Sequence, residues 1–177
     1  MPKKSVKQIE QDEKKILKEL SKNATKSIND IAEKCKFSRQ KVWRVIKNLE
    51  NNNTIWGYKP IVNQQKLDKK KYIMLMKRSN KPITKEALNH ILDREIADKV
   101  KKIGVEFINS VYLNGRYDWI ISFTANNIRD AKKVVELYND LYEGLISEIH
   151  LNEEMFTVQN NGIPNPEIKK LKDFFKA

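Results

Sequence analysis

The spacing of hydrophobic residues changes near residue 70, and this change limits the possible folds more than any other feature. Before that point, apolar side chains recur at helical intervals, beginning with Ile9, Ile16 and Leu20. After it they alternate along the chain, as at Tyr72 and Met74. A period near 3.6 indicates helices and a period of two indicates strands. The sequence therefore predicts a helical N-terminal region followed by a region that contains a β-sheet.

Three helices are predicted in the first 53 residues. The first covers 9–21, and the second begins at the N-cap candidate Ser27 and ends near Lys36. Ser38 begins the third, which reads SRQKVWRVIKNLENNN. Its apolar residues fall within about 100° of arc and must be buried; they are Val42, Val45, Ile46 and Leu49.

The opposite arc of the third helix is basic and carries no acid before Glu50. Two short helices joined by a tight turn, the second exposing cationic and amide groups, predict a helix-turn-helix that enters the DNA major groove. Arg and Lys can donate to guanine, and Gln can pair with adenine. The predicted DNA contacts on this helix are Ser38, Arg39, Gln40, Lys41, Trp43, Arg44 and Lys47. The alternative is an ordinary solvated outer face.

Positive charge is concentrated in the same region. Residues 1–70 hold 18 Lys and Arg against 8 Asp and Glu, a net charge of +10, whereas residues 71–177 hold 17 against 15, a net charge of +2. Such a field attracts polyanions because each neutralised phosphate releases condensed counterions. Double-stranded DNA is therefore the expected partner, although a lysine-rich surface can also be merely solvated.

A wing is predicted directly after the third helix. Asn51 to Asn53 form a stop in which Asn can take the left-handed conformation. Two short strands, 54–56 and 59–63, then flank Gly57, so the first domain is predicted to be a winged helix-turn-helix over 1–63. Lys59 is the wing residue expected to contact phosphate, and simple solvation is the alternative.

The second region reads as an α+β domain. A linker at 64–70 leads into a strand near 72–76, a helix over 84–102, strands at 105–113 and 117–124, a helix over 128–142 and a strand at 145–158. This βαββαβ order predicts a ferredoxin-like domain over 71–160, with an antiparallel sheet and both helices on one face. A helical tail is predicted over 161–177.

The sheet is predicted to be partly apolar on both faces. In the third strand, Trp119 and Ile121 point one way and Ile120 the other. An open apolar face is most simply covered by a second copy of the domain, which predicts a homodimer. The tail, with an apolar stripe that includes Leu171 and Phe174, is the rival cover, and both can contribute.

These features together resemble the Lrp/AsnC (feast/famine) family of prokaryotic transcription regulators over roughly residues 9–158. The resemblance rests on Ile16-Leu17-x-x-Leu20, Ile31-Ala32, Ser38-x-x-x-Val42-x-Arg44-x-Ile46-x-x-Leu49-Glu50, Ile55-x-Gly57-Tyr58 and Gly115-x-Tyr117-Asp118-Trp119. It implies dimers built through the C-terminal sheets, with tetramers or octamers beyond them, and sequence-specific regulation of transcription.

The resemblance also implies an amino acid or similar effector near the hairpin, which points to Asn114, Gly115, Tyr117 and Asp118. Asp118 could equally fix the hairpin backbone. The chain departs from the family pattern in its longer first helix, its extra tail and Asn53, where glycine is usual. These departures bear on the effector pocket and on higher assembly.

Two other functions remain open. A non-specific, DNA-coating nucleoid protein would need only the basic charge. The sirohaem decarboxylases share the two-domain architecture, but they would need histidine and arginine around the hairpin; residues 112–119 contain no histidine, and His90 and His150 stand alone. We expect no enzyme, no cofactor, no metal and no membrane partner, with the single Cys35 structural and the protein cytoplasmic and nucleoid-associated.

Overall fold

The computed structural model describes residues 5–175 of the 177-residue chain. It divides into two compact units, and the division falls between Pro60 and Ile61. Each unit has a hydrophobic core of its own, so each is described separately.

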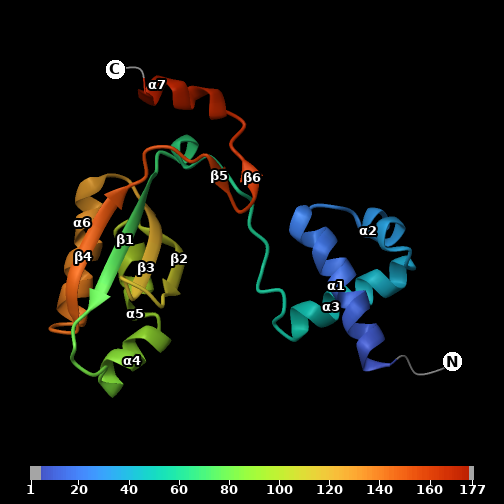
Figure 1. The fold of residues 1–177 in the computed structure, drawn as a ribbon, viewed down its shortest axis with the longest axis horizontal. Coiled ribbons are helices and arrows are strands. Elements are labelled where there is room, and N and C mark those ends of the chain that lie inside the picture. Colours follow the sequence, from blue (N-terminus) through green and yellow to red (C-terminus); the bar gives the residue numbers. More distant parts are fainter. Residues whose placement is uncertain (1–4, 176–177) are drawn as a thin grey trace. The chain divides into compact units, whose positions relative to one another are not determined.

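The first unit contains three helices, α1 (Val6–Lys22), α2 (Ile28–Cys35) and α3 (Arg39–Asn51) (Figure 1). A serine side chain caps the N-terminus of each of them, and at Ser27 it forms a capping box with Asp30. Lys36 takes the left-handed conformation, with φ 56°, in the turn between α2 and α3. The predicted helix-turn-helix is confirmed.

Most residues of the predicted apolar stripes form the core of this unit, although Ile9 stays 45% exposed. Ile16, Ile31 and Val42 are at most 1% exposed, and one residue comes from each helix. Cys35 is buried beside them, and this burial raises the pKa of its thiol. The cysteine is thus part of the core, as the sequence predicts.

The two wing strands are a wrong prediction. No strand forms over 54–63, although Asn53 takes the predicted left-handed conformation with φ 58°. The Ile55 amide donates to the Leu49 carbonyl at 2.9 Å and closes the end of α3. Pro60 removes one donor from the second predicted strand, and an isolated hairpin of this length is marginal. The segment after α3 is therefore extended chain without a ladder.

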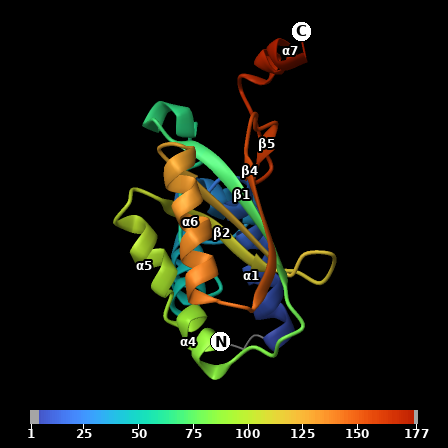
Figure 2. The same cartoon turned by 90° about the vertical axis from the view of Figure 1, so that its left-hand side faces the viewer.

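The second unit is built on a four-stranded sheet. Its strands are β1 (Lys70–Arg78), β2 (Glu106–Tyr112), β3 (Trp119–Ala125) and β4 (Ile146–Glu153), in the order β2-β3-β1-β4. All neighbouring strands pair antiparallel. The helices α5 (Glu95–Lys101) and α6 (Ile128–Leu141) lie on the same side of this sheet (Figure 2). The antiparallel α+β fold is confirmed, and the linker segment contains a short 3₁₀ turn, η1 (Gln64–Leu67).

The helix predicted over 84–102 is broken in two. The first half, α4 (Lys85–Leu92), ends before Arg94, which takes the left-handed conformation with φ 55°. In one continuous helix, Ala87 and Ile96 would lie about 180° apart, because nine residues separate them. The break lets both residues be buried in the same core, at 4% exposed each.

One face of the sheet is packed and the other is open. Tyr72, Met74 and Met76 of β1 are at most 1% exposed beneath the helices. On the opposite face, Leu75 pairs with Ile120, and both are half-buried.

The C-terminal tail differs from the single predicted helix. After β4, which ends earlier than predicted, come a two-stranded hairpin of β5 (Gln159–Asn160) and β6 (Ile163–Pro164), a 3₁₀ turn η2 (Ile168–Lys170) and α7 (Leu171–Phe175). Phe174 packs on Phe156, with ring centroids 5.8 Å apart, while Val111 on the open sheet face stays 37% exposed. The described part of the tail leaves much of that face accessible.

Candidate nucleic-acid interface

The outer face of α3 is presented to solvent because its inner face is anchored in the core. Val42 is 0% and Leu49 1% exposed, which fixes the rotation of the helix about its axis. The predicted residues Arg39, Gln40 and Arg44 consequently lie exposed on the outside. Ser38 is the N-cap, and its hydroxyl accepts a hydrogen bond from the Lys41 amide at 3.3 Å.

A hollow of about 480 Å³ lies beside the first two turns of this face. It brings together most of the predicted contact residues, and Trp43 on its wall is 54% exposed. Its lining residues are Ile28, Ser38, Arg39, Gln40, Lys41, Trp43 and Arg44. Ile28, the first residue of α2, was not predicted as a site residue, because its helical spacing marked it only as core.

Lys41 is the predicted contact that the structure turns inward. Its Nζ lies 2.6 Å from Oδ2 of Asp12, and the two side chains are 17% and 5% exposed. The same Nζ lies 3.2 Å from the centroid of the Phe37 ring. The charge of Lys41 is therefore engaged inside the domain, where it joins the first turn of α3 to α1.

Asp12 was missed by the sequence reasoning, although a signal was present. It lies three residues after Ile9 and four before Ile16, so it shares the buried face of α1. A carboxylate at such a position needs a partner. Oδ1 of Asp12 also accepts a hydrogen bond from Nε2 of Gln8 at 3.2 Å.

Lys47 is exposed at the far end of the face and is paired. Its Nζ lies 2.8 Å from Oε2 of Glu50, whose other carboxylate oxygen accepts a hydrogen bond from the Tyr58 hydroxyl at 3.2 Å. The hydrogen bond from Lys47 lowers the pKa of Glu50, so this anion persists beside the basic face. Lys47 therefore carries less uncompensated charge than Arg39 or Arg44.

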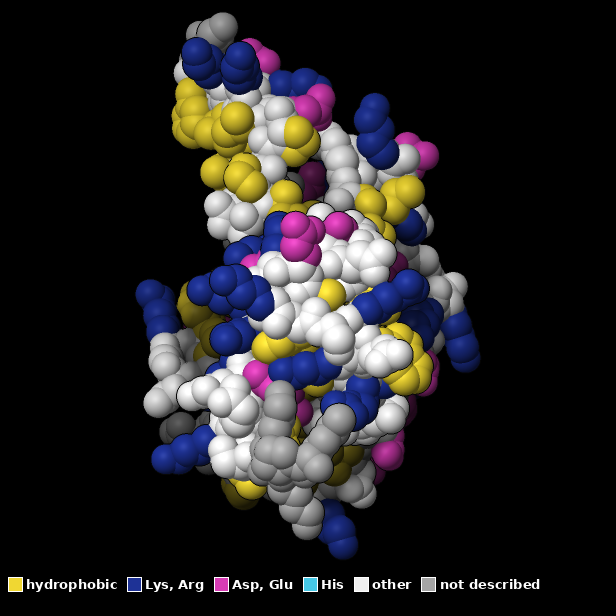
Figure 3. All heavy atoms as spheres, turned by 90° about the vertical axis from the view of Figure 1, so that its right-hand side faces the viewer, with side chains coloured by type: hydrophobic (Ala, Val, Ile, Leu, Met, Phe, Trp, Pro, Cys, Tyr) yellow, Lys and Arg dark blue, Asp and Glu magenta, His cyan; other side chains and the backbone are white. Residues whose placement is uncertain are grey.

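Lys59 lies on the extended segment after α3 and is exposed. The same segment carries Trp56, which is 95% exposed and was not predicted as a site residue. A large aromatic side chain within the polar run from Asn51 was the only signal for it. Figure 3 shows Lys and Arg side chains spread over the face of the protein that is turned to the viewer.

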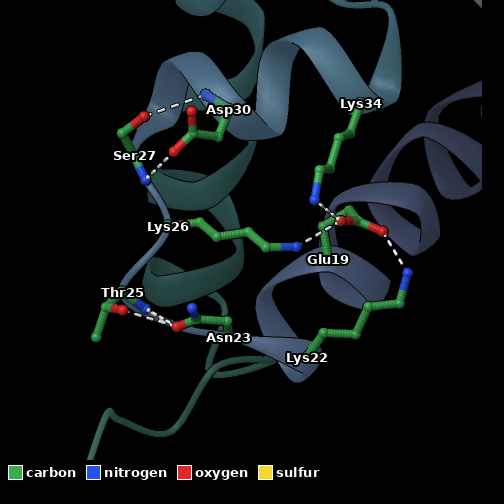
Figure 4. A network of polar contacts seen from close by, with 8 residues as sticks. All are labelled: Glu19, Lys22, Asn23, Thr25, Lys26, Ser27, Asp30 and Lys34. Atoms are coloured by element: carbon green, nitrogen blue, oxygen red, sulfur yellow. Dashed lines mark hydrogen bonds and ion pairs between the residues drawn. The ribbon is translucent and has the colours of Figure 1, made fainter.

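A cluster of charges at a distance from this face connects α1 to α2. Glu19 of α1 accepts hydrogen bonds from Lys22 at 2.6 Å and Lys26 at 2.7 Å, with Lys34 of α2 at 4.0 Å (Figure 4). Hydrogen bonds from the two nearer lysines lower the pKa of Glu19 from its ordinary 4.5 to about 2.

The hairpin residues predicted to bind an effector are only partly brought together. A hollow of about 490 Å³ is lined by Gly115 and Asp118, whereas Asn114 and Tyr117 lie outside its lining. Oδ2 of Asp118 accepts a hydrogen bond from the Arg78 amide at 2.8 Å, and this bond ties the hairpin to β1. The remaining lining residues are mostly basic or polar: Lys77, Arg78, Ser79, Asn80, Lys81, Pro82 and Arg116.

The two histidines have local partners. His90 of α4 contacts Glu95 of α5 across the helix break, and His150 of β4 packs edge-on against Tyr117 at 5.7 Å. Within residues 5–175, no group of three or more His, Cys, Asp or Glu side chains is placed to hold a metal ion. No helix in this described range combines the length and the apolar character needed to span a membrane.

Comparison with known proteins agrees with this geometry. Residues 13–55 match the family model described as winged helix-turn-helix DNA-binding. No curated protein sequence matches the chain.

Several solved structures share the fold over most of both chains. LrpC of B. subtilis is 14% identical, with a TM-score of 0.58, and the matched region covers 90% of this chain and 99% of LrpC. A transcriptional regulator from Neisseria meningitidis, solved with L-Met, is 16% identical, with a TM-score of 0.60 and coverages of 84% and 91%. A feast or famine regulatory protein from M. tuberculosis, complexed with L-methionine, is 10% identical, with a TM-score of 0.65 and coverages of 86% and 95%.

The fold and the site define a two-domain class in which a helix-turn-helix of the DNA-binding type precedes an antiparallel α+β domain. Within that class, the chain has the fold of the Lrp/AsnC regulators.

Proposed function

We propose that the protein is a sequence-specific, DNA-binding transcription regulator of the Lrp/AsnC type. The observation that carries this proposal is the outer face of α3. Arg39, Gln40 and Arg44 are exposed together on a helix whose opposite face is fixed in a core. Side chains of these types can donate to base edges in the major groove, and a rigid helix holds them in register.

Arg44→Ala tests the proposal directly. On duplexes selected for binding, loss of Arg44 should weaken affinity by roughly 1–3 kcal/mol and relax the sequence preference, as expected for a base contact. Arg129→Ala removes an equal charge from α6 of the second unit and is the matched control. Equal losses on selected and random duplexes would assign Arg44 to phosphate instead.

A coating protein is the second candidate, because the N-terminal charge attracts any duplex. Footprinting separates the two functions. Discrete half-sites about one helical turn apart, roughly 34–36 Å, support a dimeric regulator. Uniform protection along the duplex would support coating.

The open sheet face supports a homodimer within this proposal. Val111, Ile120 and Leu75 are cross-strand neighbours in one row, and they form an apolar stripe over three strands. A second copy would remove this stripe from water. Leu75→Glu should yield monomers in light scattering, whereas Leu88→Glu, at an exposed position of α4, should not. A monomeric wild-type chain would refute the dimer.

We also propose a small amino acid effector at the hairpin hollow. The support is the basic lining of that hollow and its position beside Gly115 and Asp118. Cationic side chains can hold a carboxylate through charge-assisted hydrogen bonds. Calorimetric titration with L-methionine should show binding that Arg116→Ala weakens. The absence of heat with L-methionine, L-leucine and L-lysine would remove amino acids of three side-chain types as effectors.

A further inference from the structure

The hollow beside α3 is walled by both apolar and cationic side chains. Ile28 at the start of α2 and Trp43 on α3 supply apolar side chains to its lining, while Arg39 and Arg44 supply cationic ones. Trp43 is 54% exposed, whereas Val42, Val45 and Ile46 of the same helix pack in the core. An exposed indole inside a cationic hollow is suited to a ligand that is anionic overall but presents a small apolar group.

Duplex DNA offers one apolar group in the major groove, the C5-methyl of thymine. The other bases present only donors and acceptors there. Gln40 also lines the hollow, and its amide can pair with adenine N6 and N7. The hollow thus combines a group that reads adenine with an apolar wall that fits thymine, and both select A·T pairs.

We propose that the hollow formed by Ile28 and Trp43 receives the C5-methyl of a thymine, so that bound sites carry an A·T pair at this position. The inference rests on the proposed function, because it places the hollow against the major groove. The inference names thymine as the base that Trp43 selects. The positive charge of α3 alone would bind DNA of any sequence.

Deoxyuridine provides the test, because it lacks the methyl group and keeps every hydrogen-bonding atom of thymine. Duplexes are first selected from a random library with the full chain, and each thymine is then replaced singly by deoxyuridine. Burial of one methyl-sized group predicts a loss of affinity of about fourfold at one thymine in each half-site. Replacement at the other thymines should change the affinity little.

Variants assign the effect to the hollow. Trp43→Ala should bind the thymine and deoxyuridine duplexes equally, while Trp43→Phe should restore most of the difference. Trp56→Ala removes an equally large, 95% exposed side chain outside the hollow and should keep the full difference. Thermal unfolding of each variant checks that the first unit remains folded.

The outcomes separate this inference from the proposal on which it rests. Enriched duplexes whose affinity is insensitive to deoxyuridine at every thymine would overturn the methyl pocket alone and leave the hollow to a phosphate. A Trp43→Ala variant that retains the difference between thymine and deoxyuridine would also overturn the methyl pocket alone. A selection that enriches no sequence would refute both the methyl pocket and sequence-specific binding.

Discussion

Replacing Asp12 should destabilise the first unit strongly, because it breaks a buried ion pair. Asp12 is 4% exposed, and its carboxylate lies 2.6 Å from the Lys41 ammonium. Removing one partner of such a pair costs about 3–5 kcal/mol, because the other charge is left buried. Lys41 keeps 17% exposure and its contact with the Phe37 ring, so we expect about 3 kcal/mol for Asp12→Asn.

Hydrogen exchange measures this change unit by unit. A loss of about 3 kcal/mol should accelerate the exchange of the protected amides of α1 and α3 by roughly 100-fold. The amides of β1 and β3 serve as the internal control and should exchange as before. The double variant Asp12→Leu, Lys41→Met should recover most of the loss, because no charge remains buried.

The same pair decides whether Lys41 contacts DNA. If its ammonium stays with Asp12, Lys41→Met should leave the salt dependence of DNA binding unchanged once the fraction of folded protein is taken into account. A phosphate contact would instead reduce the slope of log K against log salt by about 0.9. A cost below about 1 kcal/mol for Asp12→Asn, typical of a surface pair, would refute the reasoning.

Three further predictions concern the rest of the molecule. The depressed pKa of Glu19 stabilises the fold above pH 4.5, and this contribution is lost as the pH falls toward 2; Glu19→Gln should therefore flatten the acid limb of thermal unfolding. Asp118→Ala leaves the Arg78 amide without its acceptor and should cost about 1–3 kcal/mol, seen as faster exchange of that amide, with Asp118→Asn costing less. Ile121→Ala at a 0% exposed site should cost about 2–5 kcal/mol in urea unfolding, and more than Ile120→Ala in a monomeric variant; equal costs would contradict the assignment of the packed face.

Much of the fold follows from periodicity alone. The stripe of Val42 and Leu49 fixed which face of α3 is buried, and alternation in β1 and β3 fixed the sheet faces. The break at Arg94 was not predicted, because each of the two halves taken alone fits a helical period. Two helices are needed to bury Ile96 in the same core as Ala87, because a single helix would place the two residues on opposite sides.

The site was predictable in outline and not in detail. Helical spacing placed Arg39, Gln40 and Arg44 on one exposed face, but it gave Lys41 the same role. The partner of Lys41 lies on another helix, 29 positions earlier in the sequence, so no local pattern joins the two. The two predicted wing strands are wrong for another reason: strand propensity at 54–63 does not outweigh the donor that Pro60 removes, and an isolated hairpin of this length is marginal.

The N-terminus of α3, which Ser38 caps, differs in charge from the N-termini of three other helices. The first turn of α3 contains no acidic residue, whereas α2, α5 and α6 each place one or two there. The partial positive charge of the helix dipole at this end lies in the same turn as Arg39 and Lys41, and the charge of Lys41 is balanced by Asp12 of α1. A polyanion laid across this end would interact favourably with both the helix dipole and Arg39. Binding of nucleic acid should therefore stabilise α3, the helix that it contacts.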